Sequence, residues 1–179
     1  SSFDLDLDLA VRLARHPEKD GGFDLQEPDG KGGFRSVFRV AHEDAVSTRV
    51  VTFDGAGKKA FLLDSRGRDT AAFVELDLAT KKSRVLLDVG QADVDRLLVT
   101  PREHKVQAAL SNHLRRRWHV LDPKLRADLD VLEAASSGDV DVLGQYSYLD
   151  VWNHDRFLSK LQREPFTDDD ARALSEFGI

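Results

Sequence analysis

The sequence predicts a mainly β fold with two to three antiparallel meanders, an inserted helix and a helical C-terminal tail. Short segments rich in β-branched and aromatic residues follow one another between residues 34 and 99, separated by turn-forming residues. An Asp-Pro pair at residues 122–123 then precedes leucines at helical spacing, which indicates the helix. After Gly144 the β pattern ends, which indicates the tail.

Composition limits the partners and chemistry of this 179-residue chain. A net charge of −6 gives no dominant cationic surface, so nucleic acid is not an expected partner. The absence of cysteine excludes disulfides, thiolate nucleophiles and cysteine-ligated metal sites. The apolar runs are far shorter than the ~20 residues of a membrane helix, so no membrane span is predicted. The chain begins Ser1-Ser2 and contains no methionine, so we expect that processing, the choice of the expressed segment or incomplete coverage produced this start, and the compartment stays open.

The N-terminal part is predicted to begin with a strand over residues 3–13, where apolar residues alternate with charged or small ones. A short amphipathic helix from Leu9 to His16 is the alternative. Residues 20–33 hold five glycines and a proline around one apolar pair, which predicts turns on both sides of a brief strand.

Five consecutive antiparallel strands are predicted next. They cover residues 34–41, 48–53, 58–64, 71–79 and 82–88. Asp54-Gly55-Ala56-Gly57, Arg66-Gly67-Arg68-Asp69 and Thr80-Lys81 supply the turns between the last four. Residues 48–88 therefore form one four-stranded meander of 41 residues, which is the length of a β-propeller blade.

A second meander is predicted over residues 94–99, 105–111 and 116–122. Asp122 then caps a helix that has proline at its first position and ends at Ser136-Ser137-Gly138. Further helices are predicted in the tail, where a Thr-x-x-Asp capping box opens the last one. The predicted organisation is a partial β-propeller domain over residues 1–144 and a helical tail over residues 145–179.

Three stretches resemble the propeller region of the prolyl oligopeptidase family of serine peptidases, in its dipeptidyl aminopeptidase and acylaminoacyl peptidase branch. They are SRGRDTAAFVELDLATKKSRVLLD (65–88), ADVDRLLVTP (92–101) with Gln107-Ala108-Ala109, and LRRRWHVLDPKLRADLDVLEAASSGDVDVL (114–143). These stretches cover about half of the chain in the family's order. The resemblance implies a propeller fold, which residues 34–64 fit more loosely.

The resemblance assigns no catalytic residue to this chain. In that family the catalytic serine, aspartate and histidine lie on a separate α/β-hydrolase domain, with the serine in a Gly-x-Ser-x-Gly motif. This sequence lacks the motif, and no motif assigns any of its six histidines. From Tyr146 onward it departs from the family pattern. It is therefore either a truncated relative with a new tail, which we favour, or a joining of pieces whose connecting residues are missing.

Two or three blades cannot close a ring, so the outer strands keep free backbone groups that need cover. We therefore expect a non-catalytic binding or structural subunit of a larger assembly, whose open sheet edges are covered by protein partners, by self-association or by the tail. The alternative is the propeller part of a serine exopeptidase whose catalytic domain is not in this chain. A third hypothesis is a small-ligand binder with an all-β cavity.

The predicted partner-binding residues form two groups. A cluster of arginines and one tryptophan, flanked by His113 and His119, has the chemistry to hold a carboxylate, a phosphate or an acidic segment. The favoured alternative is a solvated strand edge with the tryptophan packed inward. Aromatic residues in the tail either dock on a partner or fold back on the chain's own sheet. The residues are Arg115, Arg116, Arg117 and Trp118 in the cluster and Tyr148, Trp152, Phe157 and Leu161 in the tail.

No cofactor or metal site is predicted. Gly30-Lys31-Gly32-Gly33 and Gly55-Ala56-Gly57-Lys58-Lys59 are glycine-rich like phosphate-binding loops, but they lack lysine followed by serine or threonine and a helix. His42-Glu43-Asp44 offers three adjacent donors, which rarely point at one ion. Asp168-Asp169-Asp170 suits the positive end of a helix better than it suits calcium.

Overall fold

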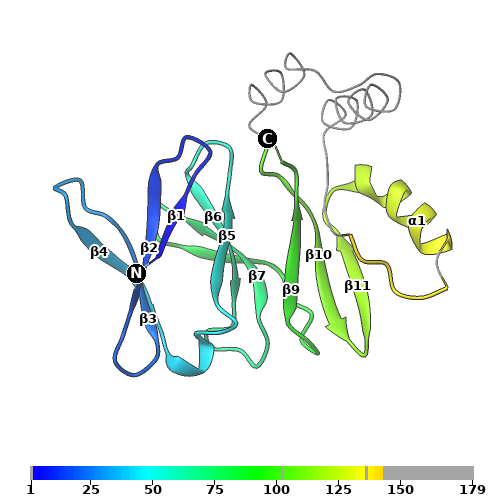
Figure 1. Ribbon diagram of the computed structural model, residues 1–179, viewed down its shortest axis with the longest axis horizontal. Helices are drawn as coiled ribbons and strands as arrows, with labels where there is room; N and C mark the ends of the chain where they lie inside the picture. Colours follow the sequence, from blue (N-terminus) through cyan, green and yellow to red (C-terminus); the bar gives the residue numbers. More distant parts are fainter. Residues whose placement is uncertain (1, 102, 136, 143–179) are drawn as a thin grey trace, which may run out of the picture. The chain divides into compact units, whose positions relative to one another are not determined.

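The computed structural model describes residues 2–101, 103–135 and 137–142. Eleven strands lie in three antiparallel sheets in this part of the chain, followed by a helix (Figure 1). The strand orders are β1-β2-β3-β4, β5-β6-β7-β8 and β11-β10-β9, so every strand pairs only with its neighbours in the sequence. Each sheet is therefore a simple meander.

The first sheet begins with a hairpin where the sequence predicts one strand. Its strands are β1 Ser2–Leu5, β2 Val11–Pro17, β3 Phe23–Pro28 and β4 Phe34–Val40. The single strand over residues 3–13 is wrong, and so is its helical alternative, because the chain reverses between β1 and β2. Asp6 fixes the reversal, since its Oδ1 accepts hydrogen bonds from the backbone N–H groups of Asp8 and Ala10, both at 3.0 Å. Within this turn, Leu9 has a left-handed φ of 59°.

The second sheet confirms the four-stranded meander predicted over residues 48–88. Its strands are β5 Arg49–Phe53, β6 Lys59–Asp64, β7 Ala72–Asp77 and β8 Ser83–Leu87. In the β5–β6 turn, Asp54 Oδ1 accepts hydrogen bonds from the backbone of Lys58 at 2.7 Å and of Lys59 at 2.9 Å. Gly57 has a φ of 62° in the same turn, which favours glycine.

The third sheet confirms the second predicted meander, with three strands and β10 in the middle. Its strands are β9 Val94–Val99, β10 Val106–His113 and β11 Arg115–Val120. Leu114, with a left-handed φ of 63°, is the one residue between β10 and β11. Among the described residues, β11 is therefore an outer strand of its sheet.

The predicted helix after β11 is confirmed. It consists of a 3-10 turn, Pro123–Leu125, and the helix α1, Arg126–Ala135. Asp122 caps its start, since the side chain accepts a hydrogen bond from the backbone N–H of Lys124. Leu125 and Leu129 are buried against the third sheet, whereas Leu132 is largely exposed.

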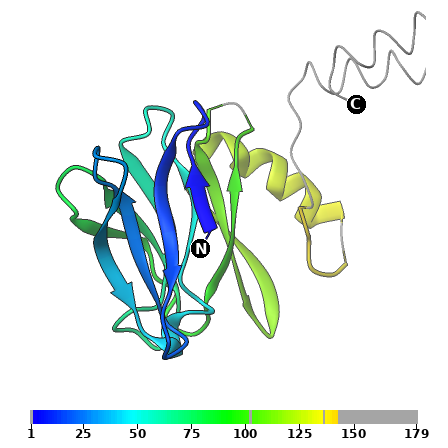
Figure 2. The ribbon, with the colours of Figure 1, turned by 60° about the vertical axis from the view of Figure 1, so that its left-hand side comes forward.

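Three apolar clusters hold the sheets and the helix together. Figure 2 shows the same ribbon as Figure 1, turned about the vertical axis. The first cluster joins the first two sheets and includes Leu25 and Phe53. The second joins the second and third sheets and includes Phe73 and Ala109. The third lies between the third sheet and α1 and includes Trp118. Burial of these side chains is the main favourable contribution to folding.

The chain is thus mainly β, as predicted, and its sheets form no closed barrel within the described residues. This arrangement is consistent with a partial propeller. The predicted tail over residues 145–179 lies outside the described residues, as does the predicted boundary at residue 144. In the described part, no helix is long and apolar enough to span a membrane.

Candidate binding site at the outer strand β11

The predicted basic cluster lies on β11, and its members differ in how far their side chains are exposed. Arg115, Arg116 and Arg117 are all exposed, while Trp118 is only 5% exposed. The tryptophan packs in the cluster under α1, and its Nε1 donates a hydrogen bond to the Val140 carbonyl at 3.0 Å. Trp118 therefore packs inward, and it anchors the segment after α1 to the sheet.

Two aspartates in that segment hold one of the arginines. The backbone N–H of Arg116 donates to Asp139 Oδ2 at 3.0 Å, and the Arg116 guanidinium pairs with Asp141. Asp141 also pairs with Arg96 of β9 at 3.1 Å. Residues 139–142 therefore cross one face of the third sheet from β11 to β9, and the charge of Arg116 is neutralised there.

The other two arginines are much less constrained. Arg115 approaches Asp139 at 3.5 Å and keeps 77% of its side chain exposed. Arg117 has no ion pair within the described residues. Both line a cavity of about 380 Å³ that runs along β11 and also includes His113 and Gln91. This cavity, which we call the β11 cleft, has the size of a ligand pocket, and its charged lining consists of three arginines with Glu133 and Asp139.

A serine and a histidine lie within hydrogen-bonding distance at the cleft. Ser111 Oγ is 2.8 Å from His119 Nε2, and both side chains line the cavity. Burial lowers the pKa of His119, and the positive charge of Arg117 lowers it further, so the imidazole is neutral at pH 7. Within the described residues, no carboxylate is hydrogen-bonded to the other ring nitrogen, so the pair lacks the third member of a catalytic triad.

A second hollow, of about 440 Å³, opens between the second and third sheets at the β9–β10 turn. Its wall is mainly apolar and includes Phe61, Leu86 and Leu121. Nearby, His104 Nδ1 lies 2.9 Å from Thr52 Oγ1, which ties this turn to β5. This hollow is the part of the described structure that corresponds to the all-β cavity of the small-ligand hypothesis.

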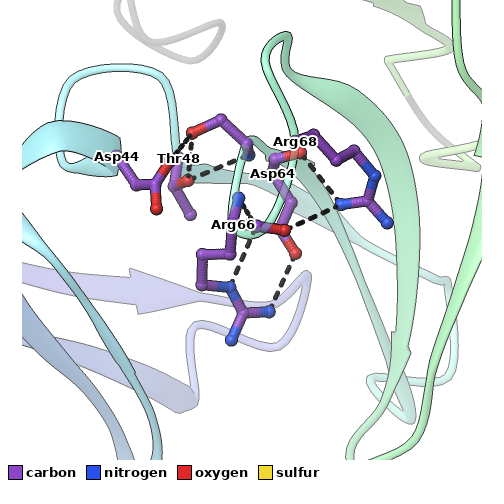
Figure 3. A network of polar contacts seen from close by, with 6 residues as sticks. Asp44, Thr48, Asp64, Arg66 and Arg68 are labelled. Atoms are coloured by element: carbon purple, nitrogen blue, oxygen red, sulfur yellow. Dashed lines mark hydrogen bonds and ion pairs between the residues drawn. The ribbon is translucent and has the colours of Figure 1, made fainter.

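The turn between β6 and β7 carries a polar network that the sequence analysis missed (Figure 3). Ser65 Oγ donates to Asp44 Oδ1 at 2.7 Å and lies 3.2 Å from Thr48 Oγ1. Asp64 holds Arg66 through two bonds, from Nε at 2.9 Å and from Nη2 at 2.8 Å. Because these groups satisfy one another, the network fixes the turn rather than offering a site.

The remaining motifs lie in turns. In the Gly30-Lys31-Gly32-Gly33 loop, Asp29 Oδ1 accepts hydrogen bonds from the backbone of Lys31 at 2.7 Å and of Gly33 at 2.9 Å. His42–Asp44 forms a 3-10 turn. Among the described residues, no three metal-ligating side chains are grouped around one point. The predicted tail residues lie outside the described part of the chain, and they are Tyr148, Trp152, Phe157, Leu161 and the run Asp168-Asp169-Asp170.

Comparison with known proteins adds a relative. No protein-family model matches the chain. It is similar to dipeptidyl aminopeptidase BIII of Pseudoxanthomonas mexicana, with 37% identity over 137 residues, which make up 76% of this chain and 20% of that protein. The chain thus spans about a fifth of the length of this relative. The similarity supports the relationship to a peptidase family that the sequence analysis inferred.

A shorter similarity involves a different kind of protein. The chain is 46% identical over 46 residues to the transcriptional regulator MraZ of Acidobacterium capsulatum. This stretch makes up 26% of the chain and 32% of that protein, so this chain again covers only part of its relative.

Proposed function

We propose that this chain is a non-catalytic, propeller-type module related to dipeptidyl aminopeptidases. We also propose that a protein partner or a second copy of the chain covers its open sheet edges. The observation that carries the proposal is the 137-residue similarity, since a match of that length must include most of the three meanders. The four-stranded meander over residues 48–88, which forms the second sheet, has the length and strand order of a propeller blade. Within the described part of the chain, three such sheets leave outer strands with unpaired backbone groups, which proteins normally cover.

Neither the sequence motifs nor the described residues offer catalytic machinery for peptidase activity. The sequence has no Gly-x-Ser-x-Gly motif. The Ser111–His119 pair lacks an orienting carboxylate within the described residues. The role of this module is therefore binding, and Arg115 and Arg117 on β11 are its best-placed contact residues. Arg116 and Trp118 support them by fixing the position of the strand.

A second candidate function follows from the coverage of the relative. Because this chain spans only 20% of a dipeptidyl aminopeptidase, it fits equally the propeller part of a serine exopeptidase whose hydrolase domain lies outside the sequence. In that case the same open edges contact the rest of the peptidase. The intact mass of the source protein separates the two candidates. A mass near 20.0 kDa supports the separate module, and a mass several times larger supports the peptidase.

The direct test is light scattering after size-exclusion chromatography, combined with a dipeptidyl p-nitroanilide assay on the purified chain. We expect self-association or co-purification with a larger complex, and no release of p-nitroaniline. A well-behaved monomer would contradict the need for an external edge cover. Proteolytic turnover by the chain alone would contradict its non-catalytic role.

A further inference from the structure

The β10–β11 hairpin has one strongly cationic face. Ser111 pairs with Arg117 and His113 with Arg115 across the two strands, and residues directly opposite each other share a face of a sheet. Neither strand contains an aspartate or glutamate, so the hairpin itself supplies no counter-charge. In a chain with a net charge of −6, this local excess of cations is a specific feature rather than a property of the whole surface.

The open edge of β11 also presents backbone donors. The N–H of Arg116 points away from β10, since it donates to the carboxylate of Asp139, which lies outside the sheet. Antiparallel pairing alternates, so the N–H groups of Trp118 and Val120 point to the same open side. Among the described residues, the first two sheets each contain four strands and this sheet contains three.

Asp139 shows which chemistry this edge accepts. Its carboxylate takes a backbone hydrogen bond from Arg116 at 3.0 Å and lies 3.5 Å from the Arg115 guanidinium. One carboxylate thus contacts the edge donor and the cationic side chain together. The adjoining Arg117 has no ion pair in the described part of the chain, although it lines the same cleft.

We propose that the β11 edge binds an extended acidic peptide segment as an added strand, which displaces Asp139 from the Arg116 N–H and pairs its carboxylates with Arg115 and Arg117. The two arginines are two residues apart on one strand, so they match acidic residues at alternate positions of a peptide. Main-chain hydrogen bonds supply affinity in this mode of recognition, and the side-chain pairs supply specificity. The inference rests on the proposed binding function and names the chemistry of the partner.

The test uses the full chain and a fluorescein-labelled peptide of alternating Glu and Val, about nine residues long. A matched peptide carries Gln in place of Glu, and fluorescence anisotropy measures the Kd of each. We expect the Glu peptide to bind at least about tenfold more tightly and to weaken as NaCl is raised from about 0.05 to 0.3 M. Equal affinity for both peptides, or no binding of either, overturns the proposal.

Protein variants locate the site. The double substitution Arg115→Gln/Arg117→Gln should weaken the Glu peptide about tenfold, and Arg117→Lys should retain part of the affinity. The matched control is Arg84→Gln, which removes an exposed arginine from β8, the outer strand of another sheet, and should leave the Kd unchanged. Thermal unfolding confirms that each variant is folded. An equal loss in the control and the double variant overturns the proposal.

Backbone methylation distinguishes an added strand from a simple anion site. N-methyl groups on one set of alternate peptide residues should abolish binding, whereas N-methyl groups on the other set should be tolerated. Two results would show a small-anion site and overturn the added strand. One is an equal effect of the two sets of N-methyl groups. The other is complete displacement of the peptide by glutarate at a concentration equal to the peptide's Kd. Neither result alters the light-scattering test, so the proposed function is judged separately.

Discussion

The two interfaces between the sheets are closed by different chemistry. Between the first and second sheets, charged groups seal the apolar core, since Lys81 pairs with Glu27 and the Arg66 guanidinium lies 3.4 Å from the centroid of the Phe38 ring. Between the second and third sheets, the polar contacts within the described residues are hydrogen bonds rather than ion pairs. Arg49 donates to the carbonyl of Asp95 there, for example.

This difference distinguishes the interface between the first two sheets, which stabilises the fold, from the third sheet, which has groups available for binding. In the sealed interface, charged side chains already have partners within the protein. At the third sheet, the β11 cleft and the apolar hollow remain open, and Arg117 is left without an ion pair in the described structure. Recognition is therefore expected at the third sheet, and three measurements test this contrast.

The largest effect is expected in the sealed interface. Phe53 is 2% exposed in the core between the first two sheets, so Phe53→Ala should lower the free energy of unfolding by about 3–5 kcal/mol. Urea denaturation measures this change. The control Val46→Ala, at a residue 87% exposed, should change it by less than about 0.5 kcal/mol. Similar losses in the two variants would contradict the assigned core.

An intermediate effect is expected for the charge that seals this interface. Burial disfavours the charged form of Glu27, but hydrogen bonds from Lys81 and Arg35 outweigh it and lower its pKa. Glu27→Gln should therefore cost about 1–2 kcal/mol at pH 7, since solvent around the exposed Arg35 screens part of the interaction. Urea denaturation at several pH values measures this cost.

The pH dependence of that cost follows from the direction of the pKa shift. The stabilisation by Glu27 is fully present above the unfolded pKa of about 4.5, and it is lost as the pH falls through the lower folded value. The difference between wild type and variant should therefore shrink in acid. A difference that stays constant from pH 7 down to about pH 3 would argue against this ion pair.

The smallest effect is expected in the third sheet, on the pKa of His119. Arg117→Gln removes a positive charge beside His119, so the pKa of His119 should rise towards its usual value of about 6.5. Since the folded pKa is lowered, stability falls as the pH drops below about 6.5, and the variant should lose less. NMR titration of the imidazole measures the shift, with Arg84→Gln as a control. An unchanged pKa would place Arg117 away from the cleft.

Sequence reasoning succeeded where the signals are local. The turns and alternation between residues 48 and 88 predicted four strands, and Asp122 with Pro123 predicted the helix start. The same reasoning failed at residues 3–13, because Leu7 and Leu9 continue the alternating pattern through what is a turn. The hydrogen bonds that Asp6 makes to the backbone decide the reversal, and hydrophobic periodicity does not report them.

The candidate site was predictable only as a cluster. Composition identifies three consecutive arginines, but it does not show that Asp139 and Asp141, more than twenty residues away, hold Arg116 and leave Arg117 open. The polar network around Ser65 gave no signal either. The partners of Ser65 lie 17 and 21 residues away in the sequence. Small polar residues are common in turns, so their presence does not indicate such a network.

The meander order also determines how the chain folds as it is synthesised. All strand pairs among the described residues are sequence neighbours, so each loop closure has a small entropic cost. The first sheet is complete at Val40, yet its apolar face is covered only when Phe53 and Leu62 follow. A nascent chain that ends between these points exposes that face, and an exposed apolar face of this kind is prone to aggregation.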